Sequence, residues 1–447
     1  MQPVIRRTLS ICPVCLKRLP ADIVKAGQDC FLEKECPEHG FFSTVIWRGS
    51  PELESWGDYT PPMDSASPGC PTGCGLCSSH LQKTCCALVE VTSRCNLKCP
   101  VCFAFAGGDE AGGGKTDVEP SIKTLYGAFQ RLAAQGNTFV QLSGGEATVR
   151  NDLPEIVAAA KKAGCETIQL NSNGIRLGTD AGYAQALKDA GLSFVFMQFD
   201  GTEDAIYEKL RGQPLLARKM AAIKVCGDLN LGVTLVPTVV PGVNDHNIGG
   251  IVEFGLSHSP AVRGIHFQPV SYFGRYPAPP ENKDRITLPE ILSAIEAQSG
   301  GKIKTSAFAP SNCDHPRCGF HGDFVVLPDS VLALTSGKKS TACCDDTVHI
   351  KNRNFVARRW TRPDDGTPLY GISLEPAGAD YRDDYRDMDT FLTRVRSHGF
   401  TITAMAFQDA YTLDLERLRR CSLHVYREGR VIPFCAHYLT SCDGEKV

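Results

Sequence analysis

Hydrophobic and polar positions alternate regularly between Ala87 and about residue 305. Six short runs rich in β-branched and aromatic residues recur there, and amphipathic stretches with helical spacing separate them. The runs are ALVEVT, TFVQLSG, TIQLNSN, FVFMQFDG, GVTLVPTVV and GIHFQPV. Strands that alternate with helices in this way are typical of βα units. The sequence therefore predicts an α/β fold whose parallel sheet curls into a partial (β/α)6-type barrel.

Charge and hydropathy narrow the class of protein. The 447 residues carry a formal net charge of −3, and Lys and Arg are scattered along the chain, so a nucleic acid is not an expected partner. The N-terminal stretch MQPVIRRTLSICPVC lacks the apolar segment of a signal peptide, and no run reaches the roughly 18 apolar residues of a spanning helix. We expect a cytoplasmic protein without a membrane span, for which peripheral membrane contact stays open.

The cysteine content points to metals. The chain has 21 cysteines, in tight clusters and in an odd number. In a reducing compartment such clusters are more often metal-binding or catalytic than disulfide-forming.

The stretch VTSRCNLKCPVCFA follows the first predicted strand, at the edge of the sheet where βα loops carry the chemistry of barrels. Its thiols, Cys95, Cys99 and Cys102, supply three ligands where a closed metal site uses four. Three thiolates can hold three irons of a [4Fe–4S] cluster and leave the fourth iron open to a small molecule. This CxxxCxxC spacing resembles the signature of the radical S-adenosylmethionine (SAM) enzymes, in which that molecule is SAM. The alternative is a zinc site that borrows a distant fourth ligand.

Two further stretches extend this resemblance. QLSGGEAT ends the second predicted strand with Ser143, Gly144, Gly145 and Glu146, where the superfamily has a GGE-like motif that receives the methionine amino group. Glycines allow a close backbone approach, and a carboxylate accepts a hydrogen bond from an ammonium. At the ends of the third and fourth strands we expect cofactor contacts, the last two toward a ribose, from Ser172, Asn173, Gln198 and Asp200. Tyr272 and Arg275 are candidates for the SAM carboxylate or for substrate.

The N-terminal cysteines form two pairs about twenty residues apart, as in a site with one tetrahedral ion. The expected ligands are Cys12, Cys15, Cys36 and His39. Cys30 competes with His39, and the ion is Fe or Zn. Four more thiols suffice for a closed [4Fe–4S] cluster, with Cys86 as the alternative to the last of them. They are Cys70, Cys74, Cys77 and Cys85.

The segments CPVC…CPEHG, GCPTGCGLC, FQPVSYFGR, CDHPRC and FQDAYTLDLERLRRCSLHVYREGRVIPFC together resemble the archaeal tetraether lipid synthase family and its bacterial relatives. The resemblance implies a rubredoxin-like metal, the radical cluster and two auxiliary clusters, three [4Fe–4S] clusters in all. The cysteines that match the second auxiliary cluster are Cys313, Cys318, Cys421 and Cys435. We divide the chain into a rubredoxin-like or zinc-ribbon-like domain (1–58), an auxiliary-cluster segment (59–86), the radical SAM core (87–305) and a C-terminal auxiliary-cluster domain (306–447).

Three functions are compatible with these features. The resemblance favours cleavage of SAM to a 5′-deoxyadenosyl radical that functionalises an unactivated carbon, with C–C bond formation on a lipid-like substrate. The second is radical transfer of a methyl or aminocarboxypropyl fragment from SAM to a small molecule or heteroatom. The third is an iron–sulfur electron carrier without enzymatic activity. Either enzyme would need a low-potential electron donor such as ferredoxin or flavodoxin.

Overall fold

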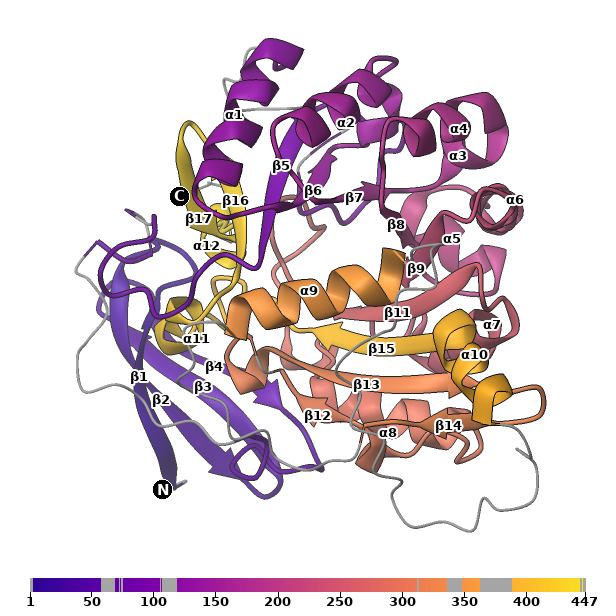
Figure 1. The fold of residues 1–447 in the computed structure, drawn as a ribbon. Coiled ribbons are helices and arrows are strands. Elements are labelled where there is room, and N and C mark those ends of the chain that lie inside the picture. The colour runs from indigo at the N-terminus through magenta and orange to yellow at the C-terminus, as the bar shows by residue number, and fades with distance from the viewer. Residues whose placement is uncertain are drawn as a thin grey trace.

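The computed structural model of the protein describes residues 3–57, 69–71, 73, 75–104, 106, 119–311, 313–335, 348–361, 388–442 and 444 (Figure 1). The described strands form two sheets: a four-stranded sheet at the N-terminus and a 13-stranded sheet that contains the barrel.

The N-terminal sheet is antiparallel, with strand order β1-β2-β3-β4. Its strands are β1 (Val4–Ile11), β2 (Arg18–Ala26), β3 (Asp29–Cys36) and β4 (Gly40–Trp47). Ile23, Leu32 and Trp47 are buried in the main hydrophobic core of the protein. The small sheet thus shares its core with the barrel, which a unit of about fifty residues needs because it buries little surface of its own.

The large sheet has the order β12-β13-β15-β11-β9-β8-β7-β6-β5-β16-β17, with β10 on β11 and β14 on β13. The predicted strand runs appear in it as β5 (Cys86–Thr92), β6 (Phe139–Gly144), β7 (Thr167–Ser172), β8 (Phe194–Gln198), β9 (Gly232–Val236), β10 (Thr238–Val239) and β11 (Val262–Pro269). Neighbours from β5 to β11 pair in parallel. The expected mixed α/β fold with a parallel partial barrel is confirmed.

Helices follow the strands and cover the outer face of this sheet (Figure 1). They are α1 (Ile122–Ala134), α2 (Leu153–Lys162), α3 (Ile175–Thr179), α4 (Ala181–Asp189), α5 (Asp204–Arg211), α6 (Leu216–Asp228), α7 (Ile248–Ser257) and α8 (Leu288–Gln298). The first shows how the sequence specifies them. Ser121 caps it by accepting from the backbone N–H of Thr124. Leu125, Phe129 and Leu132 then recur at helical spacing and are buried against the sheet.

The C-terminal part does not form a separate sheet among the described residues. Its strands are β12 (Ala309–Pro310), β13 (Gly319–Val326), β14 (Val331–Ala333), β15 (Gly399–Met405), β16 (Leu423–Arg427) and β17 (Arg430–Pro433). Of these, β15 pairs in parallel with β11, while β16 pairs in parallel with β5 at the opposite end of the barrel strands. The boundary placed at residue 305 therefore does not separate two sheets, because the last third of the chain extends the barrel sheet on both sides.

The remaining helices are α9 (Val348–Thr361), α10 (Met388–His398), α11 (Leu415–Arg419) and α12 (Phe434–His437). Short 3₁₀ turns occur at Ala147–Val149, Asp245–Asn247, Asn282–Asp284, Thr305–Ala307 and Pro316–Cys318. None of the helices that the structure describes combines the length and apolar character needed to cross a membrane.

Candidate functional site

The cysteine loop lies where the sequence placed it, directly after β5. Cys99 is buried, and Cys95 and Cys102 are half-buried in one small hydrophobic cluster with Leu97. Burial raises the pKa of Cys95 to about 11, and the nearby charges of Glu146, Cys99 and Cys102 add to this effect. A thiol whose pKa is raised in this way needs a cationic partner to become a thiolate, and a metal cluster would supply one.

The two glycines of SGGE approach the cysteine loop itself. A Cβ on Gly144 would lie 2.1 Å from the carbonyl oxygen of Thr92, and one on Gly145 would lie 2.2 Å from that of Arg94. Gly144 also has a φ of 129°, which side-chain-bearing residues rarely adopt. The backbone N–H of Gly145 donates to Thr92 O at 2.9 Å. The close approach that the sequence analysis assigned to a ligand is, in this structure, an approach to the backbone that carries Cys95.

Glu146 is buried, and its carboxylate accepts four hydrogen bonds. The donors are the N–H and hydroxyl of Thr148, at 3.1 and 2.6 Å, the hydroxyl of Ser172 at 2.8 Å and the N–H of Asn173 at 2.6 Å. The side chain therefore ties β6 to the end of β7. Its expected role as acceptor for the methionine amino group stays a prediction. In that role, the carboxylate oxygens would accept from the amino group in addition to these four donors.

Asn173 extends this connection to the cysteine loop. Its side-chain amide donates to Asn96 Oδ1 at 2.7 Å and accepts from the N–H of Ile175 at 3.0 Å. Ser172 accepts from the N–H of Gly174 at 3.0 Å. Both residues thus organise the loop, and a cofactor contact for either remains a prediction.

Asp200 forms an ion pair with another residue of the protein. It is fully buried, and its two oxygens accept from the guanidinium of Arg211 at 2.8 Å each. The backbone N–H of Thr238 adds a third hydrogen bond at 3.2 Å. This geometry disfavours the expected ribose contact. Gln198 is half-buried and accepts from Lys219 at 3.2 Å, so it remains the better candidate of the two.

Sequence reasoning missed two buried cations beside the loop, because helical Lys and Arg residues are usually on the surface. Lys219 is fully buried, which lowers its pKa to about 8, and it donates to the carbonyl oxygen of Asn173. Burial opposes the charge of Arg211, but Asp200 and Cys99 outweigh it and raise the pKa of the guanidinium. A permanent positive charge therefore adjoins the thiol of Cys99.

Arg275 also holds the cysteine loop. Its Nε and Nη2 donate to Cys99 O at 3.1 and 2.9 Å, and Nη2 also donates to Ala106 O at 2.9 Å. The backbones of Arg275 and Cys102 exchange two further hydrogen bonds, at 2.9 and 3.0 Å. A Cβ on Gly274 would lie 2.5 Å from Cys102 O. Arg275, a candidate for the SAM carboxylate or for substrate, is here part of a clamp on the loop backbone, and its contact with either molecule stays a prediction.

The N-terminal ligands converge. One ligand atom each of Cys12, Cys15, Cys36 and His39 lies within 4.8 Å of the others. The imidazole Nδ1 of His39 is 3.6 Å from the sulfur of Cys12 and 3.5 Å from that of Cys36. Cys30 instead belongs to the hydrophobic core. A Cys₃His set of this kind fits one tetrahedral zinc ion, with His39 as its fourth ligand.

The cysteines expected in the auxiliary clusters are only partly brought together. Cys74 lies outside the described residues, whereas Cys70 is half-buried and Cys77 is exposed. A hydrogen bond with Cys85, together with burial, raises the pKa of Cys313. These two thiols therefore adjoin, although the sequence predicts them in different clusters.

In the C-terminal set, burial raises the pKa of Cys421, and the charges of Cys435 and Cys318 add to this effect. These three thiols therefore lie near one another.

Cys86 is the alternative to Cys85 as a ligand of the first auxiliary cluster. It faces the barrel interior and contacts Gln141 Oε1 at 3.6 Å, so it is the weaker alternative.

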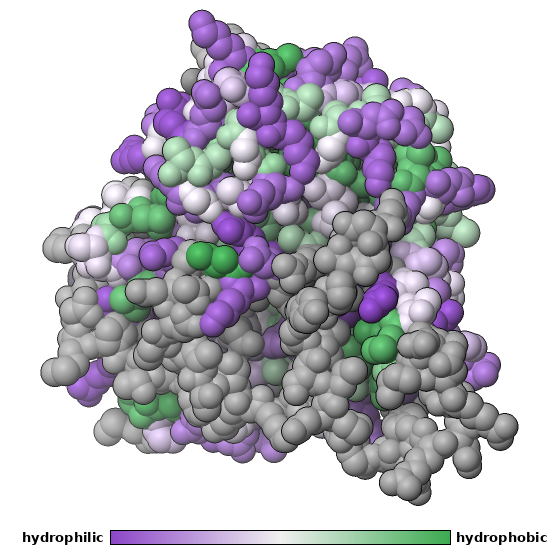
Figure 2. All heavy atoms as spheres, in the orientation of Figure 1, coloured by the Kyte–Doolittle hydropathy of each residue, from purple (hydrophilic) through white to green (hydrophobic). Residues whose placement is uncertain are grey.

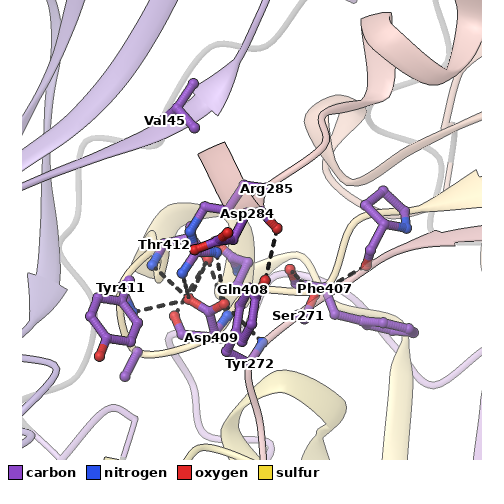
Figure 3. Close-up of polar contacts among 12 residues, drawn as sticks. Val45, Ser271, Tyr272, Asp284, Arg285, Phe407, Gln408, Asp409, Tyr411 and Thr412 are labelled. Atoms are coloured by element: carbon purple, nitrogen blue, oxygen red, sulfur yellow. Dashed lines mark hydrogen bonds and ion pairs between the residues drawn. The ribbon is translucent and has the colours of Figure 1, made fainter. Parts of the chain in front are cut away.

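A buried polar network surrounds Asp409 and joins it to Tyr272 and Arg285 (Figure 3). Asp409 accepts from the guanidinium of Arg285 at 2.8 and 3.3 Å and from the backbone N–H of Tyr272 at 3.0 Å. From β3, Lys34 donates to two neighbouring backbone carbonyls at 2.8 and 2.9 Å. Because Tyr272 precedes Arg275 by three residues, this network helps to fix the clamp relative to the ribbon.

Two family models match the ribbon and the core of the barrel. Residues 4–48 match the HMPTM N-terminal zinc ribbon domain, and residues 89–255 match the radical SAM superfamily. The 7,8-dihydro-6-hydroxymethylpterin dimethyltransferase of Methanocaldococcus jannaschii is 32% identical over 97% of this chain and 93% of its own length. A GTP 3′,8-cyclase of Edwardsiella ictaluri is 32% identical over 37% of this chain and half of its own. A structure of SuiB from Streptococcus suis gives a TM-score of 0.38, at 14% identity over 45% of this chain and 44% of SuiB.

Together, the fold, the cysteine loop and the matched regions define a radical SAM enzyme with an N-terminal zinc ribbon. The chain belongs to the family of the M. jannaschii 7,8-dihydro-6-hydroxymethylpterin dimethyltransferase. A radical SAM enzyme uses a [4Fe–4S] cluster and SAM, for which the three half-buried to buried cysteines of the loop are a fitting set.

Proposed function

We propose that the protein is a radical SAM methyltransferase that acts on a reduced pterin or a closely related small molecule. The observation that carries this proposal is the extent of the similarity to the pterin dimethyltransferase, which covers 97% of this chain. It therefore includes the ribbon and the C-terminal segments, which lie outside residues 89–255 that match the radical SAM superfamily as a whole. The second function drawn from the sequence, fragment transfer to a small molecule, is thus better supported than the first.

C–C bond formation on a lipid-like substrate has less support. The similarity to a pterin enzyme argues against the tetraether synthase resemblance as a guide to substrate. On the face drawn in Figure 2, apolar residues form small separate groups among hydrophilic side chains. The described surface on this face offers no broad apolar area of the kind that marks a lipid-binding site.

The residues that would hold the cofactors are those of the cysteine loop and its supports. Cys95, Cys99 and Cys102 would bind a [4Fe–4S] cluster, whose chemistry is delivery of one electron to SAM so that its C5′–S bond breaks. Arg275 and the SGGE turn fix the loop backbone through the hydrogen bonds described above. Lys219 and Arg211 supply buried positive charge beside it. Such fixed groups orient reactants and exclude water.

The other metal sites are part of the same proposal. Zinc in the ribbon would be structural, since its four ligands lie at the turns and at one strand end of one small sheet. Two auxiliary [4Fe–4S] clusters would use the remaining cysteine sets, and the contact of Cys85 with Cys313 supports placing these sets next to each other. A low-potential carrier such as ferredoxin or flavodoxin would supply the electron.

The test is turnover by anaerobically reconstituted enzyme with SAM, dithionite and 6-hydroxymethyl-7,8-dihydropterin. We expect 5′-deoxyadenosine together with a pterin product heavier by one or two methyl substitutions. SAM with a deuterated methyl group shows whether SAM donates that methyl. Formation of 5′-deoxyadenosine without any change in the pterin, with new products from a lipid extract instead, would overturn the proposal. Absence of 5′-deoxyadenosine under all conditions would favour the electron carrier.

A further inference from the structure

Four residues form a belt across the inner face of the barrel, one on each of the strands β5 to β8. Glu90 is in register with Ser143, and Asn171 is in register with Phe196. The amide of Asn171 donates to the hydroxyl of Ser143 at 3.4 Å, which joins the two pairs at one level. We call Glu90, Ser143, Asn171 and Phe196 the inner belt.

Side-chain alternation places the belt inside the barrel. Successive side chains of a strand point to opposite faces, and Val89 and Val91 pack into the main core with helices α1 and α2. Glu90 therefore faces the interior, as does Cys86, which contacts Gln141. Glu90, Asn171 and Phe196 are each half-buried, so the interior at this level is accessible.

The belt lies between the cysteine loop and a plug of aromatic side chains. Trp360, from α9, packs against Phe194 with ring centres 5.3 Å apart and against Phe196 at 4.9 Å. These contacts close the interior below the belt. Above it, β5 and β6 continue within a few residues into the cysteine loop and the SGGE turn. A molecule resting on the belt would thus adjoin the radical-generating loop.

Glu90 is anchored from the C-terminal part of the chain. The hydroxyl of Tyr438 donates to Glu90 Oε1 at 2.9 Å, and Nε2 of His437 lies 3.6 Å from Oε2. Burial and the Glu90 carboxylate hold the pKa of Tyr438 well above its usual range, so the phenol stays a donor. The Glu90 side chain is nevertheless 29% exposed. An oriented yet reachable carboxylate is suited to receive donors from a ligand.

We propose that Glu90 determines substrate specificity by accepting two parallel hydrogen bonds from the 2-amino group and the N3–H of a pterin ring, with Phe196 against the ring. This inference rests on the proposed function and names the residue that recognises the substrate. A carboxylate complements two adjacent donors, whereas an amide side chain complements a donor next to an acceptor. A lumazine has a carbonyl where a pterin has the 2-amino group. The parent enzyme should therefore reject it.

The test compares binding of 6-hydroxymethyl-7,8-dihydropterin and the corresponding dihydrolumazine to reconstituted, SAM-bound enzyme by calorimetry. Glu90→Gln should weaken pterin binding roughly ten- to hundred-fold and bring the lumazine to equal or tighter binding. Iron content should not change. The matched control is Glu253→Gln, the same chemical change on an exposed helical residue that pairs with Lys302, which should leave both affinities unaltered.

The outcomes separate this inference from the function that it rests on. If the parent neither binds nor methylates the pterin, the proposed function fails. If the parent acts on the pterin while Glu90→Gln keeps the parental preference for pterin over lumazine, only the role of Glu90 is wrong. Phe196→Leu provides a second variant: it should weaken both heterocycles by a similar factor, because stacking does not distinguish them. Unchanged affinity for both would also contradict the belt as the binding surface.

Discussion

The ribbon site takes its ligands from two turns of one small antiparallel sheet, whereas the cysteine loop carries Cys95, Cys99 and Cys102 on eight consecutive residues. In the ribbon, strand pairing brings Cys12 and Cys15, between β1 and β2, close to Cys36, the last residue of β3, and to His39, in the turn that follows. The cysteine loop has no strand pairing along most of its length. Arg275 and the SGGE turn hold it instead, from distant parts of the chain.

The difference follows from what each site has to do. A structural ion needs a closed tetrahedral set, and its binding energy contributes to folding. A cluster that keeps one iron open for a cosubstrate needs three ligands on one side and external supports that fix them. We therefore expect mutations in the ribbon to act mainly on folding, and mutations around the loop to act mainly on chemistry.

The largest effect should come from replacing Cys95, Cys99 and Cys102 together with alanine. The other cysteine sets are untouched, so iron should fall by about four per chain, the content of one cluster. Formation of 5′-deoxyadenosine with dithionite should fall to background while zinc stays constant. Metal analysis and product chromatography measure both. Parental cleavage of SAM by this variant would make the loop a structural metal site.

The ribbon counterpart is Cys12→Ala combined with Cys36→Ala. Loss of two of the four ligands removes the ion, and with it the folding energy of the small sheet. We expect low soluble yield and loss of zinc, measured by expression level and metal content. The side chain of Lys34 would also lose its fixed place against the C-terminal segment. A well-folded but inactive variant would instead assign the ribbon a part in electron transfer.

A smaller effect is expected for Arg275→Lys. Lysine keeps the charge but lacks the planar fork that reaches both Cys99 O and Ala106 O. The cysteine ligands remain, so iron content should be nearly parental, while small misplacement of the loop lowers the rate of SAM cleavage by roughly ten- to hundred-fold. Arg131→Lys, at an exposed arginine that donates to Tyr426, is the control. Equal rates for both variants would show that the clamp is dispensable.

Features that depend on residues close together in the sequence could be predicted from it, whereas contacts between distant residues could not. Period-two and helical patterns are local, and they predicted the strands β5 to β11 and the helices between them. The CxxxCxxC, SGGE and paired cysteine motifs are local too, and they marked the loop and the ribbon. The clamp joins residues 99 and 275, and Asp200 pairs with a helix residue eleven positions away. No rule of residue spacing predicts such contacts. For the same reason no local pattern predicts that β15 pairs with β11 and β16 with β5.

The smallest effect concerns His266, on the inner face of β11 and bonded to Thr403 at 2.8 Å. Burial lowers its pKa to about 4. In the unfolded chain a histidine titrates near 6.5, so below that pH the unfolded state binds a proton that the native state does not. Stability from this group is complete above about pH 6.5 and is lost progressively as the pH falls toward 4.

From about pH 7.5 to about pH 5.5 this one residue should lower the free energy of unfolding by roughly 1 kcal/mol. His266→Gln keeps a hydrogen-bonding side chain but cannot gain the proton, so its stability should depend less on pH over this range. Thermal unfolding of the reconstituted enzyme at several pH values measures the slope. The same change at the exposed His246 should leave the parental slope intact. Because His266 lies in the barrel and away from the ribbon, an unaltered slope in His266→Gln would assign the acid sensitivity to other groups, with the metal sites as the next to test.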